Sequence, residues 1–414
     1  MCARTADLTG LLADPLPKRF RRGTHRNLEP SDTLARIRPQ MARMGITRLG
    51  NITGLDRIGI PVAVAVRPNS RSVSASQGKG LDLPQAMASA LMEAAEGFHA
   101  EEALPDRQAS YRDLAARERV VEPEALCTTG RAFDPSASIA WIAGWDLLQH
   151  ERCWLPAEIV HTDYTLPLDG YFLAGSNGLA SGNHIVEALI AAICELVERD
   201  AVALWHAAGI RRQAGTTLDL GSVDDPDCRA LLDRYQRAGI AVEAWNVTTD
   251  IAVPAFLCRI RDPSPGDPRH LRRFQGAGCH PDRAVALARA LTEAAQTRLT
   301  YIAGIRDDLL PARYREPADA GIADALYEAL ARQETPLQFR AIAGCATDDL
   351  AADLRLLLRH LQATGIGRVV AVDLTRPDLA IPVVRVVIPG LEGDPRHPSY
   401  GAGPRARQAR AVPP

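Results

Sequence analysis

The sequence predicts a mixed α/β (α+β) protein built from a few copies of one αβ unit around a shared core. Two observations lead to this prediction. Short β-branched segments that read as strands alternate with Ala-rich helical segments along the chain. In addition, a helical pattern with matched glutamates recurs at a spacing of roughly 100 residues, which is too long a period for a solenoid.

The composition is that of a globular protein. The chain has 414 residues, enough for one large domain or two ordinary ones, and its formal net charge is −2. This charge provides no basic field that would attract nucleic acid. The sequence contains neither an apolar run of about 18 residues nor a secretory signal pattern. We therefore expect a cytoplasmic protein with no nucleic-acid or membrane partner.

The cysteines and lysines are sparse. The eight cysteines are scattered without a CxxC pair, which gives zinc little support. Among 48 Lys and Arg residues, only Lys18 and Lys79 are lysines, and Lys79 stands between two glycines. Lys79 is therefore a candidate for chemistry, although an accidental lysine is the simpler explanation.

We expect a polar arm at 1–22, one domain at 23–405 and a C-terminal tail at 406–414. The domain should open with a helix at 33–37, capped at its N-terminus by Ser31 or Asp32. The predicted strands contain β-branched residues, with a proline near each start, where proline costs little. These strands are 60–66, 253–257 and 381–388, and the Pro-rich stretches predicted as loops are 262–268 and 394–404.

The helical repeat has a fixed internal spacing. In each copy an Ala precedes a Glu by seven positions, and a Glu or Gln follows that Glu by three. Glycines lie shortly upstream, where we expect them to let phosphates approach the backbone near a helix N-terminus. The repeated pairs are Glu93 and Glu96, Glu195 and Glu198, and Glu293 and Gln296, and the glycines are Gly78, Gly80, Gly178, Gly182, Gly276 and Gly278.

The repeated carboxylates predict a cation site. Residues at i and i+3 share one face of a helix, and these pairs are embedded among apolar residues. Burying several carboxylates is costly unless cations compensate for their charge. Oxygen ligands suit Mg²⁺, which is usually held by one or two carboxylates together with phosphate and water. We expect a Mg²⁺-nucleotide site where the helices converge; a structural Arg–Glu network or an oligomer interface is the alternative.

Other catalytic patterns give little support to a different chemistry. The sequence lacks a P-loop and a dinucleotide fingerprint. Cys279 and His280 are an alternative nucleophile pair, but adjacent residues rarely form such a dyad because its members meet in space.

Several spaced motifs resemble the YcaO family of peptide-backbone amide activators. The segment 177–200 is similar to the central family motif, and 89–96 and 289–298 are similar to two others. Further similarity lies at 23–33, 372–375 and 389–403, so the resemblance runs from about residue 20 to 405. It implies a YcaO-like fold with three acidic helices converging on an ATP and Mg²⁺ site.

The resemblance also implies roles for individual residues. In the family, carboxylates hold Mg²⁺ against the phosphates of ATP. Gly97 departs from the family pattern, which usually has Arg there, so that role is absent or supplied by Lys79. The implied metal ligands are Glu93, Glu96, Glu195 and Glu198. The implied ATP-binding residues are Arg26, Thr33, Lys79, Ser89, Asn183, Glu187, Arg199, Arg289, Glu293, Gln296 and Arg298.

The implied reaction is the activation of a peptide backbone amide in the maturation of a ribosomally made peptide or protein. A nucleophile adds to the carbonyl, and ATP phosphorylates the resulting oxygen. Loss of phosphate then leaves the product. If the nucleophile was external sulfide, with a TfuA-like partner protein, this product is a thioamide, which we favour. A neighbouring Cys, Ser or Thr gives an azoline, with a leader-peptide-binding partner.

Some alternatives remain open at the level of sequence. The chain is either an enzyme, a non-catalytic ATP-binding YcaO-like scaffold, or an acidic-helix interaction protein without nucleotide. Azoline-forming members often end in a Pro-rich tail, but here only Pro413 and Pro414 are present, and we expect a disordered terminus. A homodimer is expected by analogy with the family.

Overall fold

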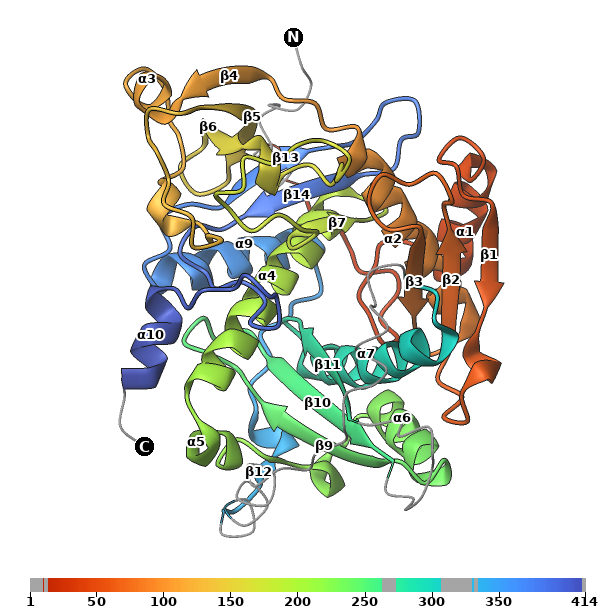
Figure 1. Ribbon diagram of the computed structural model, residues 1–414. Coiled ribbons are helices and arrows are strands. Elements are labelled where there is room, and N and C mark those ends of the chain that lie inside the picture. Colours follow the sequence, from red (N-terminus) through yellow and green to blue (C-terminus); the bar gives the residue numbers. More distant parts are fainter. Residues whose placement is uncertain (1–9, 11–13, 263–272, 307–329, 331–333, 412–414) are drawn as a thin grey trace.

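Three strand–turn–helix modules organise the molecule (Figure 1). The computed structural model describes residues 10, 14–262, 273–306, 330 and 334–411. In each module a strand leads through a short turn into a long helix. The modules are β3 (Ala75–Lys79) with α2 (Leu83–Glu101), β7 (Leu179–Ser181) with α4 (Ile185–Ala207), and β11 (Phe274–Cys279) with α7 (Arg283–Ala303). These helices are the repeated segments of the sequence, so the predicted mixed fold with repeated αβ units is confirmed.

Each module belongs to its own sheet within the described part of the chain. The first sheet has the antiparallel order β1-β2-β3, and another has the antiparallel order β11-β10-β9. The largest has the order β4-β5-β13-β14-β7, with β6 paired to β5. The remaining strands are β1 (Arg48–Asn51), β2 (Val62–Val66), β4 (Arg107–Ser110), β5 (Ser138–Asp146), β6 (Glu151–Pro156), β9 (Ala241–Asn246), β10 (Ala255–Arg261), β13 (Val370–Asp373) and β14 (Val383–Val387), and a short parallel pair of β8 (Leu218–Asp219) with β12 (Leu337–Gln338).

The predicted strands are confirmed as β2, β10 and β14, each beginning just after a proline. The predicted helix near residue 33 is also confirmed, but its predicted N-cap is wrong. The helix begins at Pro30, and the cap position is Glu29, whose side chain makes no capping hydrogen bond. Proline suits the first helical turn because its fixed φ fits the helix and its missing N–H would be unpaired there. The other helices are α1 (Pro30–Ile37), α3 (Tyr111–Ala115), α5 (Ile210–Ala214), α6 (Pro226–Arg237), α9 (Leu350–Ala363) and α10 (Pro404–Ala411).

The glycines before the helices have a packing role. A Cβ atom on Gly78 would lie 2.1 Å from the carbonyl oxygen of Ala86, and a Cβ on Gly278 would lie 2.1 Å from that of Ala286. A Cβ on Gly276 would likewise meet the α7 backbone. These three glycines let β3 and β11 lie directly on α2 and α7, which gives them a packing role in place of the expected approach of phosphate, whereas Gly80 and Gly182 line the cavity described below. The same contact explains the Ala seven positions before each Glu, since Ala86 and Ala286 are fully buried.

The N-terminal arm is packed where it is described. Leu350 donates its backbone N–H to the carbonyl oxygen of Leu16 at 2.8 Å, beside a β-bridge between Pro17 and Asp349. Lys18 forms a buried ion pair with Asp353 at the start of α9. Residues 15–22 are thus held to the body of the protein, whereas the rest of the predicted arm, apart from 10 and 14, lies outside the described residues.

The C-terminal segment also differs from the expected tail. Residues 404–411 form α10, which contacts α4 and buries Ala406. Arg405 contacts both Asp200, on α4, and Asp250. The terminus is therefore ordered as far as Ala411, and 412–414 lie outside the described residues, as does most of the predicted loop 262–268. None of the helices described is both long and apolar enough to cross a bilayer.

Candidate active site

A cavity of about 270 Å³ lies where α2, α4 and α7 meet. The segment before α1, the end of β3 and the strand β7 complete its wall. The cavity brings together most of the predicted site residues from segments far apart in sequence. Those that line it are Arg26, Thr33, Lys79, Ser89, Glu93, Glu96, Asn183, Glu187, Glu195 and Arg289.

The acidic face of α2 points into this cavity without a full charge partner. Burial raises the pKa of Glu93 to about 7, against the opposing effect of Lys79. Burial also raises the pKa of Glu96 to about 8, although Ser181 stabilises its charged form. Ser181 donates from its backbone N at 2.8 Å and from Oγ at 2.6 Å to Glu96 Oε1. Sequence reasoning did not assign Ser181 a role, although it lies within the quoted central motif.

On α4 the acidic pair is held by arginine. Arg199 Nη1 lies 3.1 Å from Glu198 Oε1, and its Nη2 lies 4.0 Å from Glu195 Oε1. Burial raises the pKa of both glutamates even though Arg199 and Arg289 oppose the shift. Glu195 lines the cavity, whereas Glu198 and Arg199 do not. These two therefore lie behind the first layer of side chains.

The third acidic pair is joined to the first module by Lys79. Its Nζ lies 3.1 Å from Glu293 Oε2 and 2.9 Å from Gln296 Oε1. Burial would raise the pKa of Glu293, but Lys79 and Arg199 outweigh it and lower that pKa to about 2. Gln296 Nε2 also donates to the carbonyl oxygen of Gln77 at 2.7 Å. Glu293 and Gln296 thus fix the lysine at the edge of the cavity, and Lys79 is the part of this trio that lines it.

The N-terminal segment is fastened to the start of α4. Both carboxylate oxygens of Glu187 accept backbone N–H groups, one from Asn27 and one from Asn183. Thr33 Oγ1 lies 3.0 Å from Asn183 Oδ1, and Arg36 Nη2 donates to the same oxygen at 3.2 Å. Glu187 thus holds these two segments together while it lines the cavity, and its expected contact with nucleotide or metal stays a prediction. Arg36 was not predicted, because no repeat or motif marks it.

One predicted residue lies elsewhere. Arg298 is 2 % exposed, and its Nε donates to Asp56 Oδ2 at 2.9 Å. It follows Glu293 by five positions, which places it about 140° away around the helix. The structure therefore corrects the assignment of Arg298 to the nucleotide, because its charge is used in a buried ion pair.

The space next to Gly97 is filled by another arginine. A Cβ on Gly97 would lie 3.2 Å from Arg67 Nη1. Arg67 itself is buried and pairs with Glu101, with 2.6 Å between Nη2 and Oε2. It is therefore committed to Glu101, and Lys79 is the cation that lines the cavity from this module.

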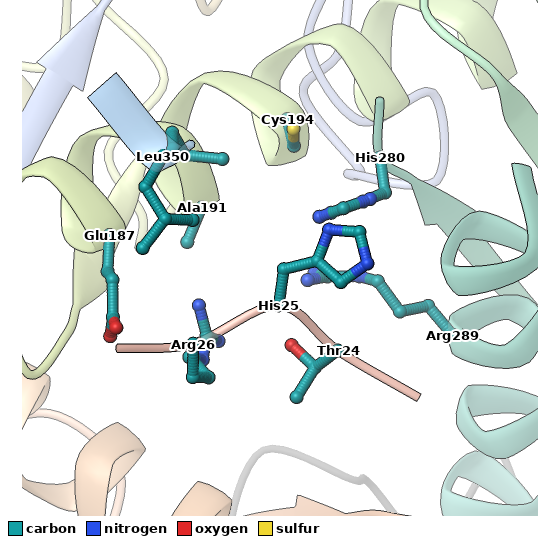
Figure 2. A pocket seen from close by; sticks show the side chains of 10 residues that line it. Thr24, His25, Arg26, Glu187, Ala191, Cys194, His280, Arg289 and Leu350 are labelled. Carbon is teal, nitrogen blue, oxygen red and sulfur yellow. The ribbon is translucent and has the colours of Figure 1, made fainter. Parts of the chain in front are cut away.

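A small recess of about 10 Å³ adjoins the cavity and shares Thr24, Arg26, Glu187, Ala191 and Arg289 with it (Figure 2). That volume is close to the minimum needed for one water molecule. The sticks in Figure 2 place the rings of His25 and His280 together at one side of this recess, with Cys194 on the α4 side.

Burial favours the neutral forms of His25 and His280, which line this recess, and of Cys279, which precedes His280 in the chain. The rings of His25 and His280 are 4.9 Å apart at an angle of 82°. Burial, together with Lys18, lowers the pKa of His25 to about 4. Burial and the neighbouring Cys194 raise the pKa of Cys279 well above its usual value, while His280 Nδ1 accepts the backbone N–H of Asp282 at 2.9 Å. These contacts argue against Cys279 and His280 as a nucleophile pair.

The donor set fits a Mg²⁺-nucleotide complex rather than a metal held by protein alone. Among the described residues, no three or more His, Cys, Asp or Glu side chains are grouped to hold an ion. Mg²⁺ in nucleotide sites usually takes only one or two carboxylates and fills its shell with phosphate and water. Glu93 and Glu96 are cavity-lining carboxylates that lack a full countercharge, and Lys79 and Arg289 line the same cavity. The chemistry of these residues therefore suits a cation with bound phosphates.

Comparison with known proteins identifies the family. Residues 77–392 match the family described as YcaO cyclodehydratase, ATP- and Mg²⁺-binding, and the chain belongs to this family. ATP and Mg²⁺ are accordingly its cofactors.

The relatives and solved structures agree with this assignment. An uncharacterised protein in the tfuA 3′ region of Rhizobium leguminosarum bv. trifolii is 38% identical over 382 residues, covering 89% of each chain. An uncharacterised protein of Methanothermobacter thermautotrophicus is 35% identical over 379 residues, covering 88% of this chain and 94% of its own.

Two solved structures show the same fold. YcaO from Methanopyrus kandleri, bound with AMPPCP and Mg²⁺, has a TM-score of 0.72 at 24% identity, covering 91% of this chain and 95% of that one. A heterocyclase in complex with substrate and cofactor has a TM-score of 0.76 at 24% identity, covering 93% of this chain and 55% of that one.

Proposed function

We propose that this protein activates a peptide backbone amide by ATP- and Mg²⁺-dependent O-phosphorylation. The observation that carries the proposal is the cavity itself, which the carboxylates of α2 line together with the cationic side chains of Arg26, Lys79 and Arg289. Such an arrangement provides electrostatic stabilisation for phosphoryl transfer, which depends mainly on positioning and on neutralising phosphate charge. The substrate would be a ribosomally made peptide or protein.

The roles of the side chains follow from their places around the cavity. Glu93, Glu96 and Glu195, which line the cavity, would hold Mg²⁺. Glu198, which lies one layer further from the cavity, would be a further ligand. Lys79 and Arg289 would bind phosphate oxygens. Arg26, Thr33, Ser89 and Asn183 line the same cavity and would contact the nucleotide, while Arg199, Glu293 and Gln296 would hold these groups in place. Bound ATP supplies the phosphoryl group and Mg²⁺ neutralises its charge.

Thioamide formation with a TfuA-like partner is the branch we favour. The supporting observation is the relative encoded in a tfuA 3′ region, which matches 89% of this chain. Azoline formation is the second candidate, because the family is described as a cyclodehydratase and a heterocyclase shares the fold. A homodimer, or a partner that binds the leader peptide, belongs to the same proposal, as does a cytoplasmic location.

The nucleotide site is tested by thermal stability with and without Mg²⁺-ATP. A ligand present at 100 times its Kd adds about 2.7 kcal/mol to the free energy of unfolding. We expect this stabilisation in the wild-type protein and in Glu124→Ala, which changes an exposed glutamate that does not line the cavity, but not in Glu195→Ala. Equal stabilisation of all three proteins would place the nucleotide elsewhere.

The product is tested by mass spectrometry of a candidate peptide incubated with ATP, Mg²⁺, sulfide and the TfuA-like partner. A thioamide raises the peptide mass by the difference between sulfur and oxygen, whereas an azoline lowers it by one water. An unchanged product in a pathway that carries Glu195→Ala, despite normal ATP binding by the wild-type protein, would support the scaffold alternative.

A further inference from the structure

Buried polar atoms without partners gather beside strand β14. Among the described residues, those without a hydrogen-bond partner include His161 Nδ1, Thr162 Oγ1, Asn177 Oδ1 and both Nε and Nη1 of Arg385. Buried polar groups are nearly always paired, so each exception requires a physical reason. Of these four residues, three belong to the segment 161–177 and the fourth, Arg385, belongs to β14.

Arg385 is the centre of this group. The side chain is 2 % exposed, and its Nη2 donates to the carbonyl oxygen of Gly175 at 2.6 Å. Burial lowers the pKa of Arg385 to about 10, while the charges of Tyr164 and Glu195 act to raise it. The same guanidinium group contributes to lowering the pKa of His161, after burial, which is the main cause. A buried cation with one carbonyl partner is costly unless it has a further use.

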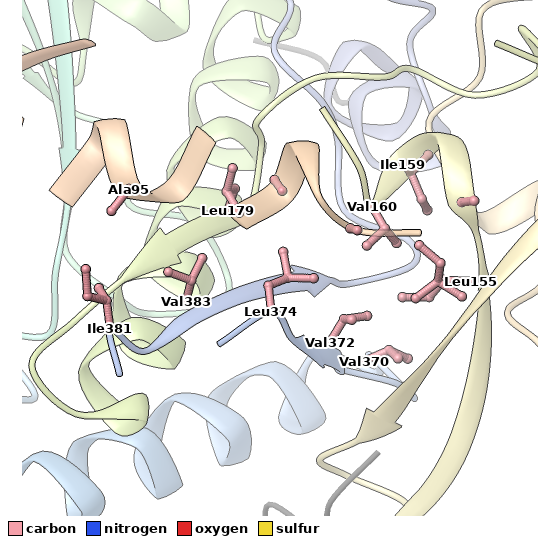
Figure 3. Packing of buried hydrophobic residues seen from close by; sticks show 14 of the residues in the cluster. Ala95, Leu155, Ile159, Val160, Leu179, Val370, Val372, Leu374, Ile381 and Val383 are labelled. Carbon is pink, nitrogen blue, oxygen red and sulfur yellow. The ribbon is translucent and has the colours of Figure 1, made fainter. Parts of the chain in front are cut away.

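The position of Arg385 links this group to the nucleotide cavity. In the β7–β14 pairing, Arg385 lies opposite Leu179, and Val383 lies opposite Ser181. Leu179 lines the cavity, and Ser181 binds Glu96. Figure 3 shows Leu179 and Val383 on the face of the sheet toward α2, which is the face that Arg385 shares by alternation along the strand. The donors of Arg385 that lack a partner therefore belong to a residue next to Leu179, in the part of the cavity wall where Ser181 binds Glu96.

The segment between its two anchors is exposed and apolar. At one end Asp163 pairs with Arg71 at 2.8 Å. At the other end the Glu158 carboxylate accepts three backbone N–H groups, from residues 170, 171 and 172. Between these anchors, Tyr164, Leu166 and Leu168 are 46%, 43% and 42% exposed. An exposed apolar stretch held at both ends presents a surface that peptide side chains can cover.

We propose that residues 161–177 and Arg385 form the subsite that binds the backbone of the peptide substrate next to the nucleotide cavity. A backbone amide offers one acceptor and one donor. Arg385 supplies donors for a carbonyl oxygen, and Asn177 Oδ1 supplies an acceptor for an N–H. Because these atoms are shielded in the ligand-free protein, the exposed stretch must shift to admit a peptide. Arg385 thus binds the peptide substrate directly, and this inference rests on the proposed function.

Hydrogen–deuterium exchange tests the subsite without requiring the natural substrate. The probe is a pool of short peptides with capped ends, added at millimolar concentration to protein saturated with Mg²⁺-AMPPCP. We expect slower exchange in 161–177 of the wild-type protein and of Arg152→Met, an exposed arginine elsewhere. Arg385→Met should lose most of this protection, and Asn177→Ala should lose part of it.

The thermal shift with Mg²⁺-AMPPCP separates this inference from the proposed function. Arg385→Met should keep the shift, because an apolar side chain of similar length replaces a buried cation, and Arg385→Lys serves as a second variant if Met disturbs folding. A normal shift without peptide protection of 161–177 would overturn the subsite alone, as would protection by inorganic phosphate instead of peptides. Loss of the nucleotide shift in the wild-type protein would overturn the proposed function itself.

Discussion

Lys79 Nζ lies 3.1 Å from Glu293 Oε2, which joins the strand of the first module to the helix of the third across 214 residues of sequence. The pair is partly exposed, at 22% for the lysine side chain and 19% for the glutamate. The ammonium group therefore has an anchor on α7 and remains accessible from the cavity. This geometry suits the role that we propose for Lys79, the binding of a phosphate oxygen.

Replacement of Lys79 should weaken nucleotide binding. Hydrogen bonds to charged groups contribute about 1.5–3 kcal/mol, so Lys79→Met should raise the Kd for Mg²⁺-ATP roughly 10- to 140-fold. Lys79→Arg keeps the charge and should lose less. Isothermal titration calorimetry measures both. An unchanged Kd in Lys79→Met would mean that the lysine only holds α7 to β3.

The packing role of the glycines predicts a loss of stability. In Gly278→Ala the new methyl group would meet the Ala286 carbonyl, and we expect a cost of about 3 kcal/mol in the free energy of unfolding. Gly367→Ala is the matched control, because a Cβ there has no neighbour within 4 Å. Urea unfolding makes the comparison. A stable Gly278→Ala protein with weakened ATP binding would instead support phosphate approach at this glycine.

Arg298 should matter for stability and not for nucleotide affinity. Removing one partner of a buried ion pair costs about 3–5 kcal/mol. The free energy of unfolding of Arg298→Met, measured by urea unfolding, should therefore be lower by that amount. The Kd for Mg²⁺-ATP should stay unchanged at temperatures where the variant is folded. Weaker binding at normal stability would restore the assignment of Arg298 to the nucleotide.

His25 should make stability depend on pH. Its pKa is about 4 in the folded protein against 6.5 for an ordinary histidine, so between these values the unfolded chain binds a proton that the folded chain does not. Stability therefore rises with pH across this range and is lost as pH falls, by up to about 3 kcal/mol. His25→Gln should flatten the profile relative to the exposed control His397→Gln. Identical profiles for the two variants would show that His25 does not titrate in this way.

The local pattern of the sequence predicted the modules and the convergence of their acidic faces. The i, i+3 glutamates and the Ala seven positions earlier are properties of single helices, which spacing reveals. The partners of these helices are not local. Ser181 reaches Glu96 across 85 residues and Arg36 reaches Asn183 across 147, and no periodicity relates such positions. For the same reason, spacing could not show that Glu293 pairs with Lys79 beside the cavity while Arg298 pairs with Asp56 elsewhere.

The junction of modules also bears on how the molecule acquires its site during synthesis. Lys79 is synthesised 214 residues before its partner Glu293, so the wall of the cavity is incomplete until α7 has left the ribosome. Pairings between distant segments are slow because a large loop must close before the contact forms. A nascent chain that ends before α7 would thus contain the acidic face of α2 and Lys79, but the lysine would lack its partner Glu293. Nucleotide can then stabilise only the late stage of folding, when all three helices are present.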